Sequence, residues 1–256
     1  MSSIHRTAEQ GFTAGAATYV SGRPDYPAAV VGWLGEELGL GDGKTALDLG
    51  AGTGKFLPFL LATGAKVLAV EPVAAMREQL ARGQPDVRVL SGAAEAIPLP
   101  DASLDAVACA QAFHWFASGA ALAEIRRVLK PGGALGLVWN IRETTAPWMA
   151  ALSAIMEPYQ GDAPRYQSQA WRTLFPAPGY GPLSERRFSH AHAGSAQQVV
   201  VERALSVSFI AALPPDQKAA VEQRLHALIE ATPELRDRAQ VSAPYATFAY
   251  ACRKLA

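Results

Sequence analysis

An acidic, glycine-rich loop is the first place in the sequence where residue types and spacing point to chemistry. The run Asp48-Leu-Gly-Ala-Gly-Thr-Gly54 follows an apolar segment that predicts a strand over 45–49, and it opens a segment that predicts a helix over 54–63. The glycines permit a tight turn and let a ligand lie against bare backbone. The loop therefore predicts a nucleotide site at the carboxyl end of the first strand.

The spacing and the charge of this loop discriminate between nucleotide ligands. A dinucleotide fingerprint has the pattern G-x-G-x-x-G, but counting from Gly50 its third glycine would fall on Lys55. Asp48 at the strand end would repel a pyrophosphate, whereas it favours the ammonium and sulfonium groups of S-adenosylmethionine, directly or through water. The alternative is that Asp48 only accepts hydrogen bonds from loop amides. We expect S-adenosylmethionine as the cofactor, and not NAD.

A second acidic residue follows at the end of the next predicted strand. Glu71 closes the strand over 66–71, where a carboxylate can accept hydrogen bonds from both hydroxyls of a ribose. A solvated glutamate at a strand end is the alternative. After the third strand, the small residues of Ser91-Gly-Ala-Ala-Glu95 could border an adenine together with Met76, although Gly92 could simply form a turn and Met76 could belong to the core.

The elements around these loops alternate between short apolar runs and alanine-rich helical patterns, which predicts an α/β fold with a parallel sheet covered by helices on both faces. Later segments predict a strand near 185–191, helices near 195–211 and 215–231, and a final strand near 245–252. The earlier predicted strands lie near 45–49, 66–71, 87–90, 104–110 and 134–140, and the earlier helices near 27–39, 54–63, 73–82 and 118–129.

The chain is expected to form a single domain over 1–256, because no low-complexity linker divides it. Segment 142–184 departs from the alternating pattern with scattered aromatic residues and prolines, which predicts a lid or acceptor-binding insertion at the carboxyl edge of the sheet. The other parts are an N-terminal cap segment with the first helix over 1–43, a cofactor-binding core over 44–141, and C-terminal strands and helices over 185–256.

Composition narrows the class of partner. The 256 residues include 23 basic and 23 acidic side chains, so the net charge gives no electrostatic case for nucleic acid or an anionic membrane. Cys109 and Cys252 match no metal or redox spacing, and no acidic cluster suggests a divalent metal. No apolar run approaches the length of a membrane span. We expect a cytoplasmic protein, either a monomer or a homodimer, without metal, nucleic acid or membrane partners.

Several motifs together resemble the class I S-adenosylmethionine-dependent methyltransferases. The run AQAFHWF over 110–116 narrows the resemblance to the small-molecule methyltransferases of the type 11 family, which include trans-aconitate methyltransferase-like proteins. The resemblance implies a Rossmann-like, seven-stranded, mostly parallel sheet with helices on both faces and a helical insertion or lid. The other matching motifs are FTAGAATY at 12–19, RPDYP at 23–27, LDLGAGTGKF at 47–56, EP at 71–72, GAAEAIPLPDASLDAV at 92–107, LKPGG at 129–133 and WN at 139–140.

The resemblance also implies positions for the cofactor. Gly50 and Gly52 would lie near its methionine part, Glu71 on the ribose, Ala93 and Ala94 by the adenine, and Ala110 near the amino group, while Tyr19 and Arg23 would help to close the site. Arg23 could also pair with the cofactor's carboxylate, although by itself it could be a surface residue before a helix. The expected cofactor-binding residues are Tyr19, Arg23, Asp48, Gly50, Gly52, Glu71, Pro72, Met76, Ala93, Ala94, Ala110 and Gln111.

Methyl transfer from a sulfonium needs alignment more than catalytic side chains. A carboxylate acceptor is already ionised near neutral pH, whereas a phenol, thiol or carbon acid benefits from a general base. His114 is the candidate base because it follows the fourth strand; the alternative is that it only packs at the strand–helix junction. The expected acceptor is a small molecule, methylated at a carboxylate or hydroxyl oxygen. Its expected pocket residues are Trp115, Arg142, Trp148, Tyr159 and Tyr166.

Other functions remain open at this point. Methylation of a macromolecule is one, although Asn140 is followed by Ile141 and Arg142 and not by the Pro-Pro-aromatic run of amino-directed nucleic-acid methyltransferases. A methyltransferase-like protein that binds the cofactor without catalysis is another, since a fold alone does not determine function.

Overall fold

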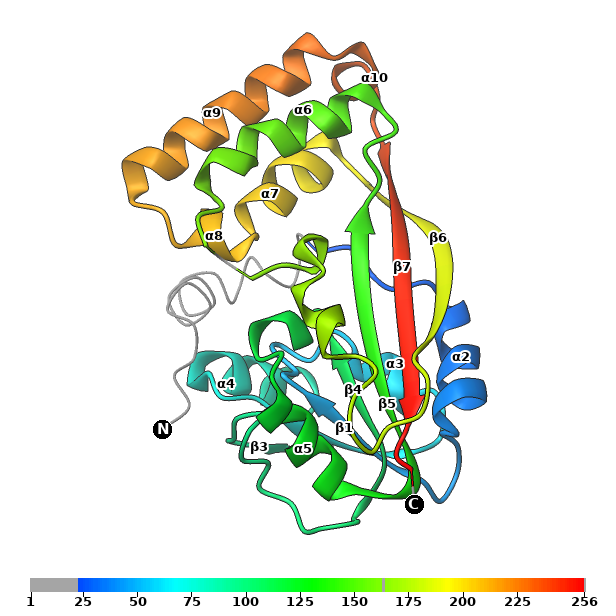
Figure 1. Ribbon diagram of the computed structural model, residues 1–256. Coiled ribbons are helices and arrows are strands. Elements are labelled where there is room, and N and C mark those ends of the chain that lie inside the picture. The colour runs from blue at the N-terminus through cyan, green and yellow to red at the C-terminus, as the bar shows by residue number, and fades with distance from the viewer. Residues whose placement is uncertain (1–22, 163, 256) are drawn as a thin grey trace.

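A seven-stranded sheet organises the computed structural model, which describes residues 23–162 and 164–255 (Figure 1). The strand order is β3-β2-β1-β4-β5-β7-β6, and β7 is antiparallel to both of its neighbours while the first five strands are parallel. The strands are β1 (Thr45–Leu49), β2 (Lys66–Val70), β3 (Arg88–Leu90), β4 (Leu104–Ala110), β5 (Leu129–Arg142), β6 (Ser184–Gly194) and β7 (Val241–Arg253). The order reverses between β1 and β4, which opens a crevice at their carboxyl ends.

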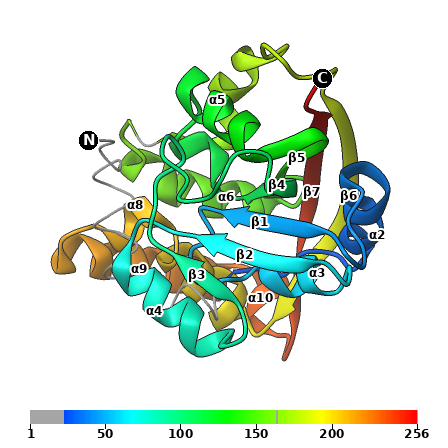
Figure 2. The ribbon, with the colours of Figure 1, turned by 90° about the horizontal axis from the view of Figure 1, so that it is seen from below.

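Helices cover both faces of the sheet, as the alternating pattern predicts (Figure 2). Helices α2, α3 and α4 contribute to the apolar core on one face, and α5 contributes to the core on the other. Their bounds are α2 (Ala29–Leu38), α3 (Leu57–Leu61), α4 (Ala74–Gly83) and α5 (Gly119–Val128). The predicted α/β fold with a mostly parallel seven-stranded sheet is therefore confirmed.

Local sequence explains where these elements begin and end. The strands β1 and β2 bury four consecutive residues each, because helices cover both faces. Helix α5 begins where the Ser118 hydroxyl accepts a hydrogen bond from the amide of Ala121 at 3.1 Å, an N-terminal cap. The predicted bounds of β1 and β4 match the structure, whereas β5 begins at Leu129, earlier than predicted, because its ladder with β4 is interrupted by a bulge and resumes at Ala134.

A helical cap stands over the carboxyl end of the sheet and has an apolar core of its own (Figure 1). Its members come from two parts of the chain, one after β5 and one between β6 and β7. They are α6 (Pro147–Met156), the 3-10 turn η2 (Glu157–Tyr159), the π-helical turn η5 (Gln197–Glu202), α7 (Arg203–Leu205), α8 (Ser208–Ala211), α9 (Pro215–Ala231) and α10 (Pro233–Arg236).

The predicted insertion over 142–184 is divided between this cap and the sheet. Its first helix, α6, joins the cap, but the stretch with the 3-10 turns η3 (Tyr166–Ser168) and η4 (Ala170–Leu174) returns to the sheet. Trp171 from η4 and the following Tyr180 are buried in the core on the α5 face. The cap therefore depends on helices from the C-terminal part of the chain, which the sequence pattern assigned elsewhere.

Gly136 in β5 allows α2 to approach the sheet closely, and replacing it should destabilise the fold. A Cβ atom at this position would lie 2.7 Å from Leu38 Cδ2 and 3.2 Å from Trp33 Cη2, both in buried side chains. We expect Gly136→Ala to lower the free energy of unfolding by about 1–3 kcal/mol, because the core must shift to admit the methyl group. Urea denaturation measures the difference.

Gly32 provides the matched control on the same helix. It is exposed in α2, and an added Cβ atom would meet nothing within 4 Å. Gly32→Ala should raise the free energy of unfolding by about 0.5–1 kcal/mol, because alanine loses less entropy in a helix. Equal effects of the two substitutions would contradict the close packing of α2 on β5.

Candidate active site

Asp48 is a buried carboxylate at the carboxyl end of β1. Its side chain is 1% exposed, and neither carboxylate oxygen has a hydrogen-bond partner among residues 23–162 and 164–255. Burial, with a smaller contribution from the nearby Glu71, raises the pKa of Asp48 to about 8. The alternative that Asp48 only accepts hydrogen bonds from loop amides is therefore wrong. A buried carboxylate without donors is costly unless a ligand supplies them.

Glu71, directly after β2, is the residue that organises the loop. Its Oε2 accepts the amide of Gly52 at 2.9 Å, and its Oε1 accepts the amide of Val73 at 2.9 Å. Burial raises the pKa of Glu71, although the two amides and the nearby Arg77 oppose the shift. Each oxygen retains a lone pair for a further hydrogen bond. Glu71 thus ties the glycine loop to the start of α4 and can still accept hydroxyl groups.

The glycine loop requires glycine at Gly50 for two physical reasons. Its φ of 72° lies in the left-handed region, where a side chain is strained. A Cβ atom there would also lie 2.8 Å from Ala112 Cβ. The amide of Gly50 donates to Val70 O at 2.8 Å, so the loop folds back over β2. These contacts bring the loop backbone to the edge of a cleft.

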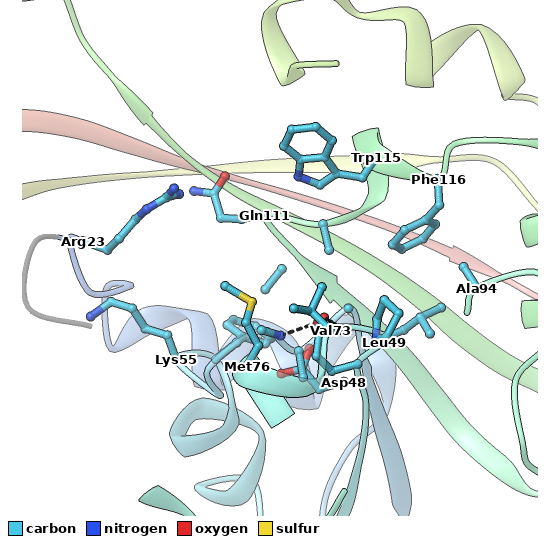
Figure 3. A pocket seen from close by; sticks show the side chains of 18 of the residues that line it. Arg23, Asp48, Leu49, Lys55, Val73, Met76, Ala94, Gln111, Trp115 and Phe116 are labelled. Carbon is cyan, nitrogen blue, oxygen red and sulfur yellow. Dashed lines mark hydrogen bonds between the residues drawn. The ribbon is translucent and has the colours of Figure 1, made fainter. Parts of the chain in front are cut away.

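The main cleft lies over the carboxyl ends of β1, β2 and β4 and holds about 1210 Å³ of space, part of it open to solvent (Figure 3). Asp48 and Met76 lie on one wall, with Trp115 and Phe116 across from them. Tyr19 lies outside the described residues. The other residues expected at the cofactor all line this cleft, namely Arg23, Asp48, Gly50, Gly52, Glu71, Pro72, Met76, Ala93, Ala94, Ala110 and Gln111.

Gln111 stands at one end of the main cleft, with its side chain directed toward that of Arg23 (Figure 3). Its φ of 56° is unusual for a residue other than glycine, and such strain is concentrated at functional sites. The side-chain amide donates to Asn140 O at 3.0 Å, and the backbone amide donates to Val138 O at 2.8 Å. Both bonds hold Gln111 between the main cleft and a neighbouring pocket.

This neighbouring pocket, which we call the arginine pocket, has a volume of about 710 Å³ and carries four arginines and no carboxylate among its described lining residues. It shares Arg23, Gln111, Trp115, Asn140 and Arg203 with the main cleft. Arg142 comes from the end of β5 and Arg203 from the start of α7. The arginine cluster consists of Arg23, Arg142, Arg165 and Arg203.

Arg142 has only weak partners within the described structure. Both of its terminal nitrogens face Met156 Sδ at 3.9 Å, and a thioether is a poor acceptor. Burial lowers the pKa of Arg142 to about 10; Tyr245 opposes this shift, and the other arginines of the cluster add to it. The guanidinium stays charged at neutral pH, so its donors are available to an anion.

Arg165 and Arg203 also have neutral partners. Arg203 is 7% exposed, and its Nε donates to the Tyr245 hydroxyl at 3.2 Å. Arg165 donates to Gln160 Oε1, and its guanidinium carbon lies 5.3 Å from the centre of the Phe209 ring. Burial and the nearby Arg203 lower the pKa of Arg165, and Glu157 opposes this shift. The described lining of the pocket thus brings several arginines together and includes no carboxylate.

His114 lies in the 3-10 turn η1 (Phe113–Trp115) and borders the arginine pocket. Its Nδ1 accepts a hydrogen bond from Trp139 Nε1 at 3.0 Å. Burial, reinforced by Arg23 and Arg165, lowers the pKa of His114 to about 3. An indole nitrogen only donates, so the proton of the neutral ring is assigned to Nε2. The predicted role of general base does not fit this geometry, because no basic nitrogen is available.

Of the residues expected at the acceptor, Trp115, Arg142 and Tyr166 line the arginine pocket, whereas two others lie elsewhere. Trp148 is 9% exposed and packs in the apolar core of the cap. Tyr159 packs against the same core. Neither contributes to the described lining of the main cleft or the arginine pocket, because α6 turns its apolar side toward the other cap helices.

Sequence reasoning did not identify Arg165, Arg203 or Lys55 as site residues. Arg203 lies far along the chain in the cap, and no local motif marks it. Lys55 follows the glycine loop, lines the main cleft and forms an ion pair with Asp25 at 2.8 Å. The only sequence signal for Lys55 was its place directly after Gly54. That position shows only that the third glycine of a dinucleotide fingerprint is missing.

Two classes of feature are absent from the part of the chain that the structure describes. No group of three or more histidine, cysteine, aspartate or glutamate residues there has an arrangement that could hold a metal ion. No described helix combines the length and apolar character needed to cross a membrane.

Comparisons with known proteins identify the family. A family model described as a methyltransferase domain matches residues 47–137. A methyltransferase-like protein of Schizosaccharomyces pombe is 38% identical over 244 residues, which cover 95% of this chain and 95% of that protein. The malonyl-[acyl-carrier protein] O-methyltransferase of Serratia marcescens is 34% identical over 140 residues, covering 53% of this chain and 55% of that protein.

The fold gives the same answer. The structure provisionally assigned as a type II methyltransferase from Anaeromyxobacter dehalogenans is 27% identical, with a TM-score of 0.60 over 91% of this chain and 97% of that one. The strand order, the acidic glycine loop and the near full-length relative agree with one another. The chain therefore belongs to the class I S-adenosylmethionine-dependent methyltransferases, in the type 11 family.

Proposed function

We propose that this protein transfers the methyl group of S-adenosylmethionine to a carboxylate oxygen of a small acidic molecule. The observation that carries the proposal is the arginine cluster, which lies beside the main cleft in a pocket without a carboxylate on its described walls. An anionic acceptor neutralises this charge through charge-assisted hydrogen bonds. A neutral phenol or thiol does not balance this charge, and it leaves the terminal nitrogens of Arg142 facing only the thioether of Met156.

The main cleft fits S-adenosylmethionine on the properties of its own residues. Asp48 offers two buried carboxylate oxygens that lack donors, which suits the cofactor's positively charged groups. Glu71 has acceptor capacity for the ribose, and Ala93 and Ala94 leave room for the adenine. When bound, the cofactor supplies a methyl group on a sulfonium, which is already activated for transfer.

The residues of this chain have little chemistry to perform beyond alignment. The reaction forms a bond between the carboxylate oxygen and the methyl carbon and breaks the bond from that carbon to sulfur, whose electron pair stays on sulfur. No proton moves, because a carboxylate is ionised near neutral pH. Arg142 and Arg203 orient the acceptor, and Trp115, which lines both the main cleft and the arginine pocket, helps to exclude water at their junction.

A screen for release of S-adenosylhomocysteine tests the proposed acceptor class. The panel contains mono-, di- and tricarboxylic acids, including trans-aconitate, together with phenols, thiols and a malonyl group on acyl-carrier protein. Malonyl on its carrier is included because a relative is named for that acceptor. We expect turnover with free acids. Turnover only with neutral acceptors or the carrier-bound group would refute the proposal, as would cofactor binding without any turnover.

Replacing Asp48 should separate stability from cofactor binding. Its folded-state pKa of about 8 exceeds the ordinary aspartate pKa of 3.8, so stability falls as pH rises between these values, by about 1.4 kcal/mol per pH unit. Asp48→Asn removes this loss. Without cofactor, we expect the variant to unfold at a higher temperature than the parent at pH 8, and to differ little near pH 4.

The same variant should bind S-adenosylmethionine about 10- to 100-fold more weakly, because it loses hydrogen bonds to a charged group. Calorimetric titration measures this affinity. The matched control is Asp86→Asn at an exposed position, which should change neither property. Normal cofactor affinity in folded Asp48→Asn would remove the basis for the cation-binding role of Asp48.

Arg142→Met should weaken the binding of the acidic acceptor without affecting the cofactor. Arg142 lines the arginine pocket but not the main cleft, and its loss removes charged donors while keeping side-chain volume. We expect the KM for the acceptor to rise about 10- to 100-fold. Initial rates and cofactor titration measure the two effects. Arg238→Met at an exposed position is the control, and an unchanged KM in Arg142→Met contradicts the proposed acceptor site.

A further inference from the structure

The hydrogen bond between Trp139 and His114 determines which nitrogen of the imidazole carries a proton. Trp139 is fully buried in β5, and its ring centre lies 4.6 Å from that of Trp171, 5.2 Å from Tyr166 and 5.9 Å from Tyr250. Such packing holds the indole in place, and a buried indole N–H needs an acceptor. His114 Nδ1 is that acceptor, at 3.0 Å.

The surroundings of His114 disfavour its protonated form on geometric grounds. A proton on Nδ1 would point at the indole N–H, which cannot accept it. The cationic groups acting on the ring are Arg23 and Arg165, and Arg165 borders the same pocket. His114 also lines a third pocket, which we call the outer pocket. The carboxylates among the described residues of its lining are Glu95 and Asp162. The imidazole therefore remains neutral, with its proton on Nε2.

The Nε2–H group is left without an acceptor within the described structure. The hydrogen bond of the ring to Trp139 uses Nδ1, and Nε2 is not fully buried. The ring is half-buried at the wall between the arginine pocket and the outer pocket. Nε2–H is thus accessible to a ligand that carries an acceptor oxygen.

We propose that His114 donates a hydrogen bond through Nε2 to the acidic methyl acceptor, and that Trp139 is a positioning residue that fixes this tautomer. The proposal rests on the proposed function for the nature of the acceptor. Because His114 donates a hydrogen bond and removes no proton, the molecule that receives the methyl group must already be ionised when it binds. His114 and the arginines then select carboxylates over alcohols and amines, which carry no negative charge to pair with these donors.

Nuclear magnetic resonance of protein labelled with ¹⁵N in histidine tests the tautomer without any acceptor. The chain has five histidines, and His114→Gln assigns the signal by its disappearance. In the parent we expect an unprotonated Nδ1, a protonated Nε2 and no titration between pH 5 and pH 8. A proton on Nδ1, or titration of His114 in this range, overturns the proposal.

Two tryptophan variants distinguish positioning from general packing. Trp139→Phe removes the indole donor, so we expect His114 to populate both tautomers and its pKa to move toward the ordinary value. Trp171→Phe is the matched control, because Trp171 is equally buried in the same aromatic cluster but its Nε1 has no hydrogen-bond partner in the described structure. Identical effects of both variants on the His114 signal refute the positioning role of Trp139.

Two substitutions of His114 separate a donor from a base, with the acid found in the acceptor screen as substrate. Glutamine donates through its amide but accepts no proton at neutral pH, whereas phenylalanine does neither. We expect His114→Phe to lose at least tenfold in kcat/KM, chiefly through KM, and His114→Gln to recover at least fivefold of that loss. Equal inactivity of both folded variants indicates a base and overturns the donor role.

The outcomes also distinguish this inference from the proposed function. If the parent methylates no acid, the proposed acceptor class fails, and the donor role toward an acid fails with it. The histidine spectra then still decide the separate question of whether Trp139 fixes the tautomer. If acids are methylated and the tautomer is reversed, only the inference about His114 and Trp139 is wrong.

Discussion

The buried, unpartnered carboxylate of Asp48 is the constraint on which the site depends. The fold holds this group at the end of a central strand, beneath a glycine turn that Glu71 secures through the amides of Gly52 and Val73. Desolvation without donors raises its pKa and lowers the stability of the empty protein near neutral pH. In the role that we propose for Asp48, a ligand with positive charge offsets this penalty, so that local destabilisation gives selectivity for the cofactor.

Carboxylates and arginines lie close together at the carboxyl edge of the sheet. The main cleft is lined by Asp48 and Glu71, and it shares Arg23 and Arg203 with the arginine pocket, where Arg142 and Arg165 complete the cluster. Gln111, Trp115 and Asn140 border both regions. Under the proposed function, a cationic methyl donor and an anionic acceptor would bind at adjacent positions, and their attraction would be strengthened once water is excluded.

The sequence was sufficient for the sheet and the glycine loop because these features are encoded locally. Apolar runs between helical patterns predicted the bounds of β1 and β4, and Asp48 and Glu71 stand directly at strand ends. Arg203 had no comparable signal, since the cap brings it to the site over a long chain separation. Trp148 misled the prediction because an aromatic side chain fits a cap core as well as a ligand pocket.

The role of His114 shows a further limit of sequence. The position of His114 after β4 was predictable from the sequence. Which of its ring nitrogens carries the proton depends on the hydrogen bond from Trp139, a residue of β5. A histidine near a strand end suggests a base, whereas the donor role that we propose rests on the direction of the indole N–H. The sequence thus placed a histidine at this site, whereas the position of the proton on its ring could be assigned only from the tertiary structure.

The long antiparallel ladder of β5 and β7 has a mechanical consequence. The pairing continues to Arg142 and Tyr245, and β6 pairs with β7 as far as Gly194 and Val241, so each route into the cap leaves directly from a hydrogen-bonded strand. Glu143, the first residue beyond β5, also donates its amide to Pro244 O at 3.0 Å. The cap is therefore joined to the sheet by strands that stay hydrogen-bonded up to its base, which ties the position of Arg203 in α7 to that of Arg142 at the end of β5.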